Sequence, residues 1–358
     1  MTERTAPLAV FRVDASIESG AGHVMRCLAL ADTLASAGWS CALASRPGTV
    51  EAIPAKAPRR EVLELAAEDK PAAMRARWPE GCDLLAVDHY GLDAAFESGC
   101  RPWARRILAI DDLADRPHDC DLLLDQTLGR TAKDYAGLVP ENCRLLLGPD
   151  YALLRSRFAA ARSKALARRR QSGPVRRILV SLGAMDVNNA TERVLEAIAL
   201  AGTDAVVDVV LGAGAPHLGE VKSHAREMGQ RVTVHTGVED MTALMARADL
   251  AIGAAGITSW ERCCLGLPTI AVVIADNQRL LARRMEAHGC IHLLGWHADV
   301  TAEDIARAVI ALASDARRRL RMSQASAAIC DGTGAARVAE RIKGMWSEET
   351  RWVSGAYQ

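Results

Sequence analysis

Residues 248–278 read ADLAIGAAGITSWERCCLGLPTIAVVIADNQ. The stretch begins as a short apolar run, passes through a glycine-rich turn into a helical segment, stops at Gly-Leu-Pro and resumes as a second apolar run. Short apolar runs bounded by glycine and proline are typical of strands buried on both faces of a parallel sheet. The stretch therefore predicts strand, loop, helix and strand in succession, which is the repeating unit of an α/β fold.

The same alternation occurs in both halves of the chain. Apolar runs that we interpret as strands lie at residues 8–14, 82–90, 105–112, 120–127, 175–186, 204–214, 230–238 and, as the last clear one, 268–278. Segments that we interpret as helices lie at residues 23–38, 188–202, 240–249, 301–313 and 333–346. The carboxyl ends of parallel strands face the ligand crevice of an open α/β sheet, and several of these runs end in Asp.

A basic, Ala-rich segment, FAAARSKALARRRQSGP (158–174), separates the two halves. We interpret it as a helix followed by a linker, because Ser-Gly-Pro is a stop signal. The chain length of 358 residues also favours two domains. We expect a first domain at residues 1–160, a linker at 161–174, and a second domain with C-terminal helices at 175–358, with a ligand cleft between the domains.

Composition excludes several classes of partner. Lys and Arg total 44 and Asp and Glu total 44, so the net charge is zero and we expect no nucleic-acid partner. No run approaches the ~20 apolar residues of a membrane helix, and the first residues lack a secretion signal. We therefore predict a cytoplasmic protein without membrane insertion. The ten cysteines include no CxxC pair, which is typical of reduced thiols. The sequence carries no signal for the oligomeric state.

A first candidate site is the turn between the first strand and the first helix. Gly20 and Gly22 flank Ala21 there, and His23 follows in the first helical turn. Met25 replaces the third glycine of a GxGxxG fingerprint, which disfavours an NAD site. The positive end of a helix favours neutral imidazole, the form that a general base needs. The alternative is a His that only packs the turn, and the pattern alone does not separate the two.

A second candidate site is the glycine-rich loop 253–261. Its backbone N–H groups are expected to face a phosphate group, and Thr258 and Ser259 either cap the following helix or add hydroxyl donors. Glu261 falls one turn into the helix. Its carboxylate either accepts the two hydroxyls of a ribose or bonds the helix start as in a capping box.

Three further segments end predicted strands with polar side chains. Asp88-His89-Tyr90-Gly91 suits sugar hydroxyls or proton transfer, or is an ordinary loop. Asp276-Asn277-Gln278 offers the mixed donors and acceptors that a pyranose needs, or an N-cap at Asp276 or Asn277. Residues 181–186 form a second turn expected to face phosphate. The motifs GxSxG, HExxH and GxxxxGK[ST] are absent, and no His stands at metal-ligand spacing, so we expect no metal and no cofactor.

The segments GAGHVMRCLALADTL, VDHYGLD, IDDLADRPHDCDLLLDQT, GPDYALLR, IGAAGITSWERCCLGLP and IADNQ occur in one order across nearly the whole chain. Together they resemble the hydrolase family of pseudaminic acid biosynthesis, which acts on UDP-2,4-diacetamido-2,4,6-trideoxy-β-L-altropyranose. This resemblance implies the GT-B fold, in which two Rossmann-like domains face each other and the second holds the nucleotide. It also implies metal-independent hydrolysis with inversion, which gives UDP and 2,4-diacetamido-2,4,6-trideoxy-L-altrose, in a pathway that serves flagellin glycosylation.

The resemblance implies three catalytic residues, which are His23, Tyr90 and Asn277 in this sequence. The sugar is expected to contact Arg12, Asp14, Gly22, Arg26, Asp88 and Gln278. UDP is expected to contact Gly183, Ala255, Gly256, Ile257, Thr258, Ser259 and Glu261. Two turns depart from the family pattern, because Ala184 and Ala255 stand where the family has Gly. A GT-B glycosyltransferase that uses a UDP-sugar donor is the nearest alternative, and a non-catalytic nucleotide-sugar binding protein is another.

Overall fold

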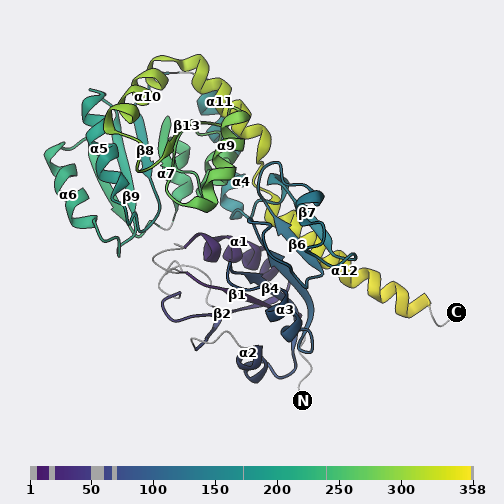
Figure 1. Cartoon of the computed structure of the whole chain (residues 1–358). Coiled ribbons are helices and arrows are strands. Elements are labelled where there is room, and N and C mark those ends of the chain that lie inside the picture. The colour runs from purple at the N-terminus through teal and green to yellow at the C-terminus, as the bar shows by residue number, and fades with distance from the viewer. Residues whose placement is uncertain are drawn as a thin grey trace.

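The structure, a computed structural model, describes residues 6–15, 21–49, 60–66, 71–171, 173–238 and 240–355, with side chains to Trp346. Gly20 of the first candidate turn lies outside the described residues. Two α/β units, each built around one parallel sheet, account for the chain (Figure 1). The α/β class and the two Rossmann-like sheets predicted from the sequence are confirmed.

The first sheet runs in the order β3-β2-β1-β4-β5-β6-β7, and all its pairs are parallel. Its strands are β1 (Leu8–Val13), β2 (Ser40–Ser45), β3 (Glu61–Glu64), β4 (Cys82–Asp88), β5 (Ala104–Ile110), β6 (Leu122–Asp125) and β7 (Arg144–Leu147). The helices between them are α1 (Gly22–Ser36), α2 (Pro71–Arg77) and α3 (Ala94–Cys100), with short 3-10 turns η2 (Ala132–Tyr135) and η3 (Pro149–Tyr151).

The second sheet runs in the order β10-β9-β8-β11-β12-β13, again parallel throughout. Its strands are β8 (Arg177–Ser181), β9 (Val206–Leu211), β10 (Val232–Thr236), β11 (Leu250–Ala254), β12 (Thr269–Val273) and β13 (Ile291–Trp296). Its helices are α5 (Ala190–Leu200), α6 (Leu218–Glu227), α7 (Met241–Arg247), α8 (Thr258–Cys264), α9 (Arg279–Ala287), α10 (Ala302–Ser314) and α11 (Ala316–Ile329), with η4 (Asp276–Gln278) before α9.

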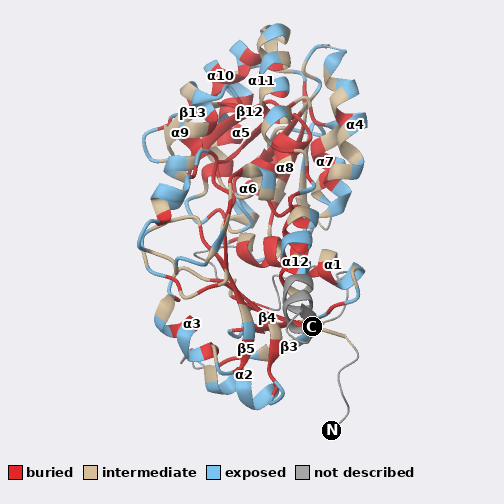
Figure 2. Cartoon of the chain, turned by 90° about the vertical axis from the view of Figure 1, so that its right-hand side faces the viewer, coloured by how far each residue is buried: buried red, intermediate tan, exposed pale blue. Residues whose placement is uncertain are grey.

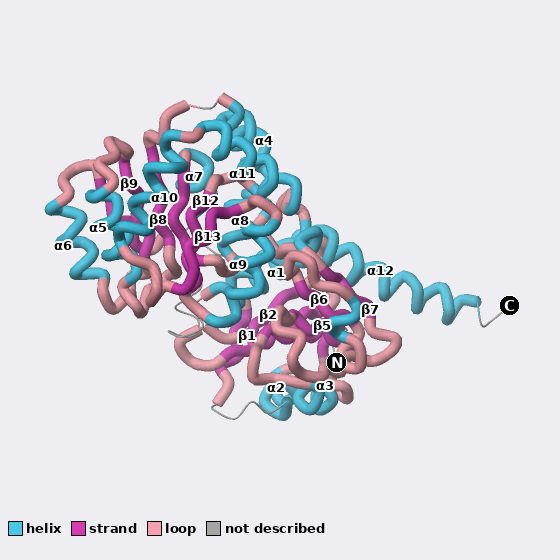
Figure 3. Tube along the Cα trace, turned by 45° about the horizontal axis from the view of Figure 1, so that its top comes forward, coloured by secondary structure: helices cyan, strands magenta, loops and turns pink. Residues whose placement is uncertain are grey.

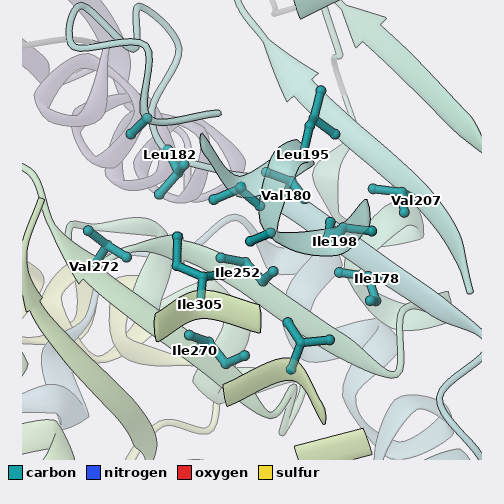
Figure 4. Packing of buried hydrophobic residues seen from close by; sticks show 14 of the residues in the cluster. Ile178, Val180, Leu182, Leu195, Ile198, Val207, Ile252, Ile270, Val272 and Ile305 are labelled. Atoms are coloured by element: carbon teal, nitrogen blue, oxygen red, sulfur yellow. The ribbon is translucent and has the colours of Figure 1, made fainter. Parts of the chain in front are cut away.

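Both sheets are covered on two faces, which explains why their strands read as continuous apolar runs. Along β1, Ala9, Phe11 and Val13 lie in one core with α1, whereas Leu8 and Val10 lie in another with α2 and α3. In the second sheet, α5 and α10 pack on one face, and α7 and α8 pack on the other. Figure 2 shows the resulting buried strands, Figure 3 shows helices on both sides of the second sheet, and Figure 4 shows the branched side chains of its core.

Several elements were not predicted from the sequence. The prediction that 268–278 is the last strand is wrong, because β13 follows it at the sheet edge. The sequence also missed β2, β3 and β7 and the helices α2, α3, α6, α9 and α11. The residues of β3 are exposed or half-buried, and β2 is built from Ser, Ala and Cys, so neither carries the branched apolar signal of a central strand.

Two helices connect the two units. Helix α4 (Ser156–Arg170) leads from the first sheet to the second, so most of the segment predicted as a linker is helical. Helix α12 (Gly334–Gly355) returns to the first unit, where Val338 and Ile342 join the core beside α1. Figure 1 shows it continuing past β7 to the C-terminus. The domain boundaries 1–160, 161–174 and 175–358 stay a prediction, which did not include this return. None of the described helices is long and apolar enough to cross a membrane.

The strand orders predict where a ligand would bind in each unit. In both sheets the order reverses beside the first strand, between β1 and β4 and between β8 and β11. Ligands of open α/β sheets bind outside the carboxyl ends of the strands at this switch point. We therefore expect ligands to contact the residues that follow β1, β4, β8 and β11, and these residues include the candidate motifs.

Candidate functional site

A buried histidine and a buried carboxylate meet at the first switch point. His23 lies in the first turn of α1 and Asp88 ends β4, and His23 Nδ1 is 2.5 Å from Asp88 Oδ1. A carboxylate only accepts hydrogen bonds, and this contact is shorter than the 3.1 Å between the same Nδ1 and an amino group of Arg26, so we assign the proton to Nδ1, which donates it to Asp88. The second ring nitrogen, Nε2, is then left with its lone pair. An imidazole in this tautomer is oriented to accept a proton at Nε2.

Asp88 is held in its charged form by a second neighbour. Arg26, one turn after His23, donates from Nε to Asp88 Oδ2 and from an amino group to Oδ1, both at 2.6 Å. Burial alone would raise the pKa of Asp88, but Arg26 and His23 together lower it well below its ordinary value. Arg26 also donates to Asp112 at 3.0 Å. The fixed carboxylate orients the His23 ring, and Arg26 acts through it.

Tyr90 and Asn277 connect the two units across the site. The Asn277 side-chain amide donates to the Tyr90 hydroxyl at 2.9 Å, and the Tyr90 ring meets the His23 ring edge-on, 4.7 Å between centroids. Burial, followed by the charge of Asp112, raises the pKa of the Tyr90 phenol, which therefore stays neutral. The structure thus brings together the three residues for which the resemblance implied catalysis. Neither Asp276 nor Asn277 caps α9, so the N-cap alternative is wrong.

The glycine-rich loop lies against the start of α1. A Cβ placed on Gly22 would come within 2.8 Å of the Ile257 side chain, so the bare glycine permits this close approach. Because Gly22 precedes His23, this contact brings the start of the histidine's helix against loop 255–259. A second bridge between the units runs from Arg284 of α9 to the Leu128 carbonyl oxygen, at 2.8 Å.

The hydroxyls of the loop do not cap the helix that follows. Thr258 and Ser259 accept hydrogen bonds from Arg262 at 3.2 and 2.9 Å, and the N-cap of α8, Ile257, makes no side-chain cap bond. The capping interpretation of these hydroxyls is therefore wrong. Since α8 has only seven residues, the loop itself, more than the helix dipole, must supply donors to an anion. Arg262 is a residue of the site that the sequence analysis missed.

Glu261 carries an unsatisfied carboxylate oxygen. Its Oε2 is buried without a hydrogen-bond partner. The N-cap of α8 is Ile257, which has no polar side chain, so the capping-box alternative is not observed. Burial raises the pKa of Glu261 to about 7, although Arg262, Arg155 and Arg157 oppose the shift. A buried acceptor without a donor costs stability, and hydroxyl groups of a ligand would satisfy it.

The remaining predicted sugar contacts lie beside β1. Arg12 is fully buried and donates twice to Asp14, at 2.6 and 2.8 Å. Burial opposes ionisation of Asp14, but hydrogen bonds from His89 and Arg12 lower its pKa below the ordinary value. The His89 Nδ1 accepts from the backbone N–H of Gly91, so its Nε2 faces Asp14. The structure places this cluster beside the switch point but gives Arg12 no exposed surface.

The second switch point is completed by Gly183 and Gln278. Gly183 has φ +102°, which only glycine adopts readily, so the turn after β8 needs it. Gln278 accepts from the backbone N–H of Ile274, and its amide nitrogen lies against Gly256. The carbonyl oxygen of Ala184 is held by the backbone N–H of Gly212 at 2.7 Å.

Among the described residues, no three His, Cys, Asp or Glu side chains form a group that could hold a metal ion.

The second half of the chain matches a known family of domains. Residues 177–342 match the model described as the glycosyltransferase family 28 C-terminal domain. Residues of this chain are 34% identical, over 150 residues, to the UDP-2,4-diacetamido-2,4,6-trideoxy-beta-L-altropyranose hydrolase of Campylobacter jejuni; the match covers 42% of this chain and 52% of that protein. They are 28% identical, over 218 residues, to the spore coat polysaccharide biosynthesis protein SpsG of Bacillus subtilis, with 59% and 61% covered. The matches thus span half to three-fifths of these relatives.

The fold is shared more widely than the sequence. The crystal structure of Acinetobacter baumannii MurG superposes with a TM-score of 0.66 at 15% identity, covering 94% of this chain and all of that one. At this identity the likeness shows the fold alone, and that fold is GT-B. The GT-B prediction is confirmed.

Proposed function

We propose that this chain hydrolyses a UDP-sugar, UDP-2,4-diacetamido-2,4,6-trideoxy-β-L-altropyranose, to UDP and the free sugar, without a metal and with inversion. The observation that carries the proposal is the His23–Asp88 pair, whose Nε2 is available as a proton acceptor beside loop 255–259 of the other unit. The name of the Campylobacter jejuni relative supports the substrate and the reaction. For this chain, the substrate and the reaction are our proposal.

The nucleotide is assigned to the second unit. Its diphosphate meets the loop 255–259, and the two ribose hydroxyls meet the unsatisfied Glu261 carboxylate. Gly183 holds open the neighbouring turn after β8. Donors that are already oriented stabilise the negative charge that grows on the leaving diphosphate, without reorganisation during the reaction.

Water attacks the anomeric carbon from the face opposite UDP. The new bond joins the water oxygen to this carbon, the bond from the carbon to the phosphate oxygen breaks, and His23 Nε2 takes a proton from the water. The electron pair of the broken bond leaves on UDP. Arg26 and Asp88 keep the histidine in the tautomer that accepts this proton. Attack opposite the leaving group accounts for the inversion.

The sugar is assigned to the space between the two units. Because the side-chain nitrogen of Asn277 donates to Tyr90, the side-chain oxygen of Asn277 can accept a hydrogen bond from an N–H or O–H group of the sugar. We assign Asp14, Gly22 and Gln278 to this space, whereas the buried Arg12, Arg26 and Asp88 act by fixing Asp14 and His23. Since the base and the nucleotide site belong to different units, both must be in contact for the reaction.

A glycosyltransferase is the second candidate. The match of residues 177–342 to a glycosyltransferase domain model favours it. In that case His23 would deprotonate an acceptor alcohol in place of water. A protein that only binds the nucleotide sugar would not need a His–Asp pair beside loop 255–259, where the substrate is assigned.

Incubation of the protein with the UDP-sugar, without an acceptor and with excess EDTA, tests the proposal. We expect stoichiometric UDP and free sugar at an undiminished rate, because backbone and hydroxyl donors replace a metal at the leaving group. Intact substrate that is consumed only after an alcohol acceptor is added would establish the transferase. Activity that is lost in EDTA and restored by Mg²⁺ or Mn²⁺ would contradict the metal-independent mechanism.

Glu261→Gln is expected to weaken UDP binding by about 1–3 kcal/mol, because the amide is a poorer acceptor for the ribose hydroxyls. The unliganded variant should also be more stable than the wild type at pH 8. A carboxyl whose pKa is raised to about 7 in the fold binds more protons folded than unfolded between about pH 4.5 and 7, so its ionisation costs stability as pH rises. Calorimetry with UDP and melting curves at pH 5 and pH 8 measure both effects. Unchanged UDP affinity would remove Glu261 from the site.

A further inference from the structure

Arg262 lies buried under the glycine-rich loop. Only 2% of its surface is exposed, and its amino groups donate to the Ala254 carbonyl oxygen at 2.5 Å and to the hydroxyls of Thr258 and Ser259. A Cβ on Gly253 would come within 2.6 Å of the guanidinium, so the glycine makes room for it. The guanidinium thus fills the space between the end of β11 and the first turn of α8.

This guanidinium has no ion-pair partner among the described residues. No carboxylate oxygen there lies within ion-pair distance of it, its Nε is buried without a hydrogen-bond partner, and the charge of the neighbouring Glu261 acts on it without direct contact. Burial lowers the pKa of Arg262 to about 10, so it remains charged at neutral pH. Buried charges are otherwise paired, because an unpaired one is expensive to remove from water. An anion supplied by a ligand would complete the pair.

The bonds of Arg262 also set the polarity of the loop. A guanidinium can only donate, so Thr258 and Ser259 must use oxygen lone pairs to accept from it. Their hydroxyl protons are then left to be donated elsewhere. Two hydroxyl donors beside a buried guanidinium that has no ion-pair partner among the described residues suit phosphate oxygens, which accept only.

We propose that Arg262 is a positioning residue for a diphosphate group on loop 255–259, turning Thr258 and Ser259 into donors and receiving its counter-charge from the ligand. The inference rests on the proposed nucleotide site, and it assigns a role to a residue that does not itself touch the substrate. It accounts for a buried charge whose partners are all neutral. It also gives a reason for the glycine at position 253.

The test compares Arg262→Met with Arg226→Met, which makes the same change at an exposed position on α6. Calorimetry and melting curves are measured with UDP, inorganic pyrophosphate and uridine. For Arg262→Met we expect UDP and pyrophosphate to bind about 10–100-fold more weakly, the usual effect of losing charge-assisted hydrogen bonds, with uridine binding unchanged. The rise in melting temperature caused by UDP should shrink accordingly. The Arg226→Met protein should bind all three ligands like the wild type.

A purely structural Arg262 predicts a different pattern. In that case Arg262→Met would lower the melting temperature of the unliganded protein. The ligand affinities of the folded fraction and the UDP-induced rise in melting temperature would stay intact, which would overturn the inference. If Arg262→Met does not fold, the same binding measurements are made on Arg262→Lys with the same three ligands. The lysine keeps the charge but lacks the planar fork that reaches the three acceptors of Arg262, so a selective loss for UDP and pyrophosphate supports the inference. An equal loss for all three ligands, or none, overturns it.

The outcome is separable from that of the proposed function, because binding needs no turnover. A wild-type protein that binds UDP and pyrophosphate but hydrolyses no UDP-sugar would overturn the hydrolase proposal and leave the Arg262 assignment standing. A wild-type protein that hydrolyses the UDP-sugar, together with unchanged ligand affinities in Arg262→Met, would support the hydrolase proposal and overturn the Arg262 assignment.

Discussion

His23→Asn is expected to lower the single-turnover rate of UDP-sugar hydrolysis by about 10²–10⁴-fold, the usual contribution of a general base. UDP affinity should stay near that of the wild type, because the nucleotide is assigned to the other unit. The asparagine can still hydrogen bond to Asp88, so the fold around Arg26 should be preserved. Circular dichroism, UDP titration and single-turnover hydrolysis on the same preparation measure the three quantities.

His118 offers a matched control for this experiment. It is also buried in the first unit, with its Nδ1 2.8 Å from a Glu97 carboxylate oxygen. His118→Asn should lower stability, with activity falling only in proportion to the folded fraction. A well-folded His23→Asn protein that hydrolyses the substrate at nearly the normal rate would contradict the role of His23 as the base.

Asp88→Asn is expected to reduce hydrolysis by about 10³–10⁴-fold, because the asparagine can donate to Nδ1 and so favours the wrong tautomer of His23. It also leaves Arg26 buried with one carboxylate fewer, which costs about 3–5 kcal/mol of stability. A carboxyl with a lowered pKa contributes stability above its unfolded pKa, and this is lost only as pH falls toward the folded value. The stability difference should therefore be full at pH 7 and shrink in acid.

Urea unfolding at pH 7 and in the acid range measures the stability effect, and single-turnover rates corrected for the folded fraction measure the catalytic one. Asp115→Asn is the control, because Asp115 is an exposed carboxylate paired with Arg116. A folded Asp88→Asn protein with wild-type turnover would show that Asp88 does not orient the histidine.

The sequence predicted the central elements of both sheets, and it singled out candidate site residues that the structure brings together at the first switch point. β1, β4, β8 and β11 are buried on both faces and therefore read as apolar runs. Polar residues follow β1 and β4, whereas glycine-rich turns with small and apolar residues follow β8 and β11. The edge strand β13 could not be predicted in the same way, because most of its residues are only half-buried. The return of α12 to the first unit depends on contacts with α1 that lie far away in the sequence.

The site was predicted as residue types at strand ends, but not as a network. Asn277 and Tyr90 are 187 positions apart, and only the packing of the two units shows that they are hydrogen bonded. Arg262 escaped notice because one arginine in a short helix looks like an ordinary surface residue. The one sequence feature that could have indicated a buried Arg262 is Gly253 near the end of β11, because a glycine there leaves space for a long side chain. Thr258 and Ser259 looked like caps because their hydroxyls follow a loop, and the buried arginine decides otherwise.

The central claim is that water, activated by His23, attacks the anomeric carbon opposite UDP. Proton NMR of the first minutes of hydrolysis, before the free sugar equilibrates its anomers, tests it most directly. The account predicts that the β-linked substrate first gives the α anomer of the free sugar, together with one equivalent of UDP and in the absence of any acceptor. First appearance of the β anomer, or no free sugar at all, would contradict it.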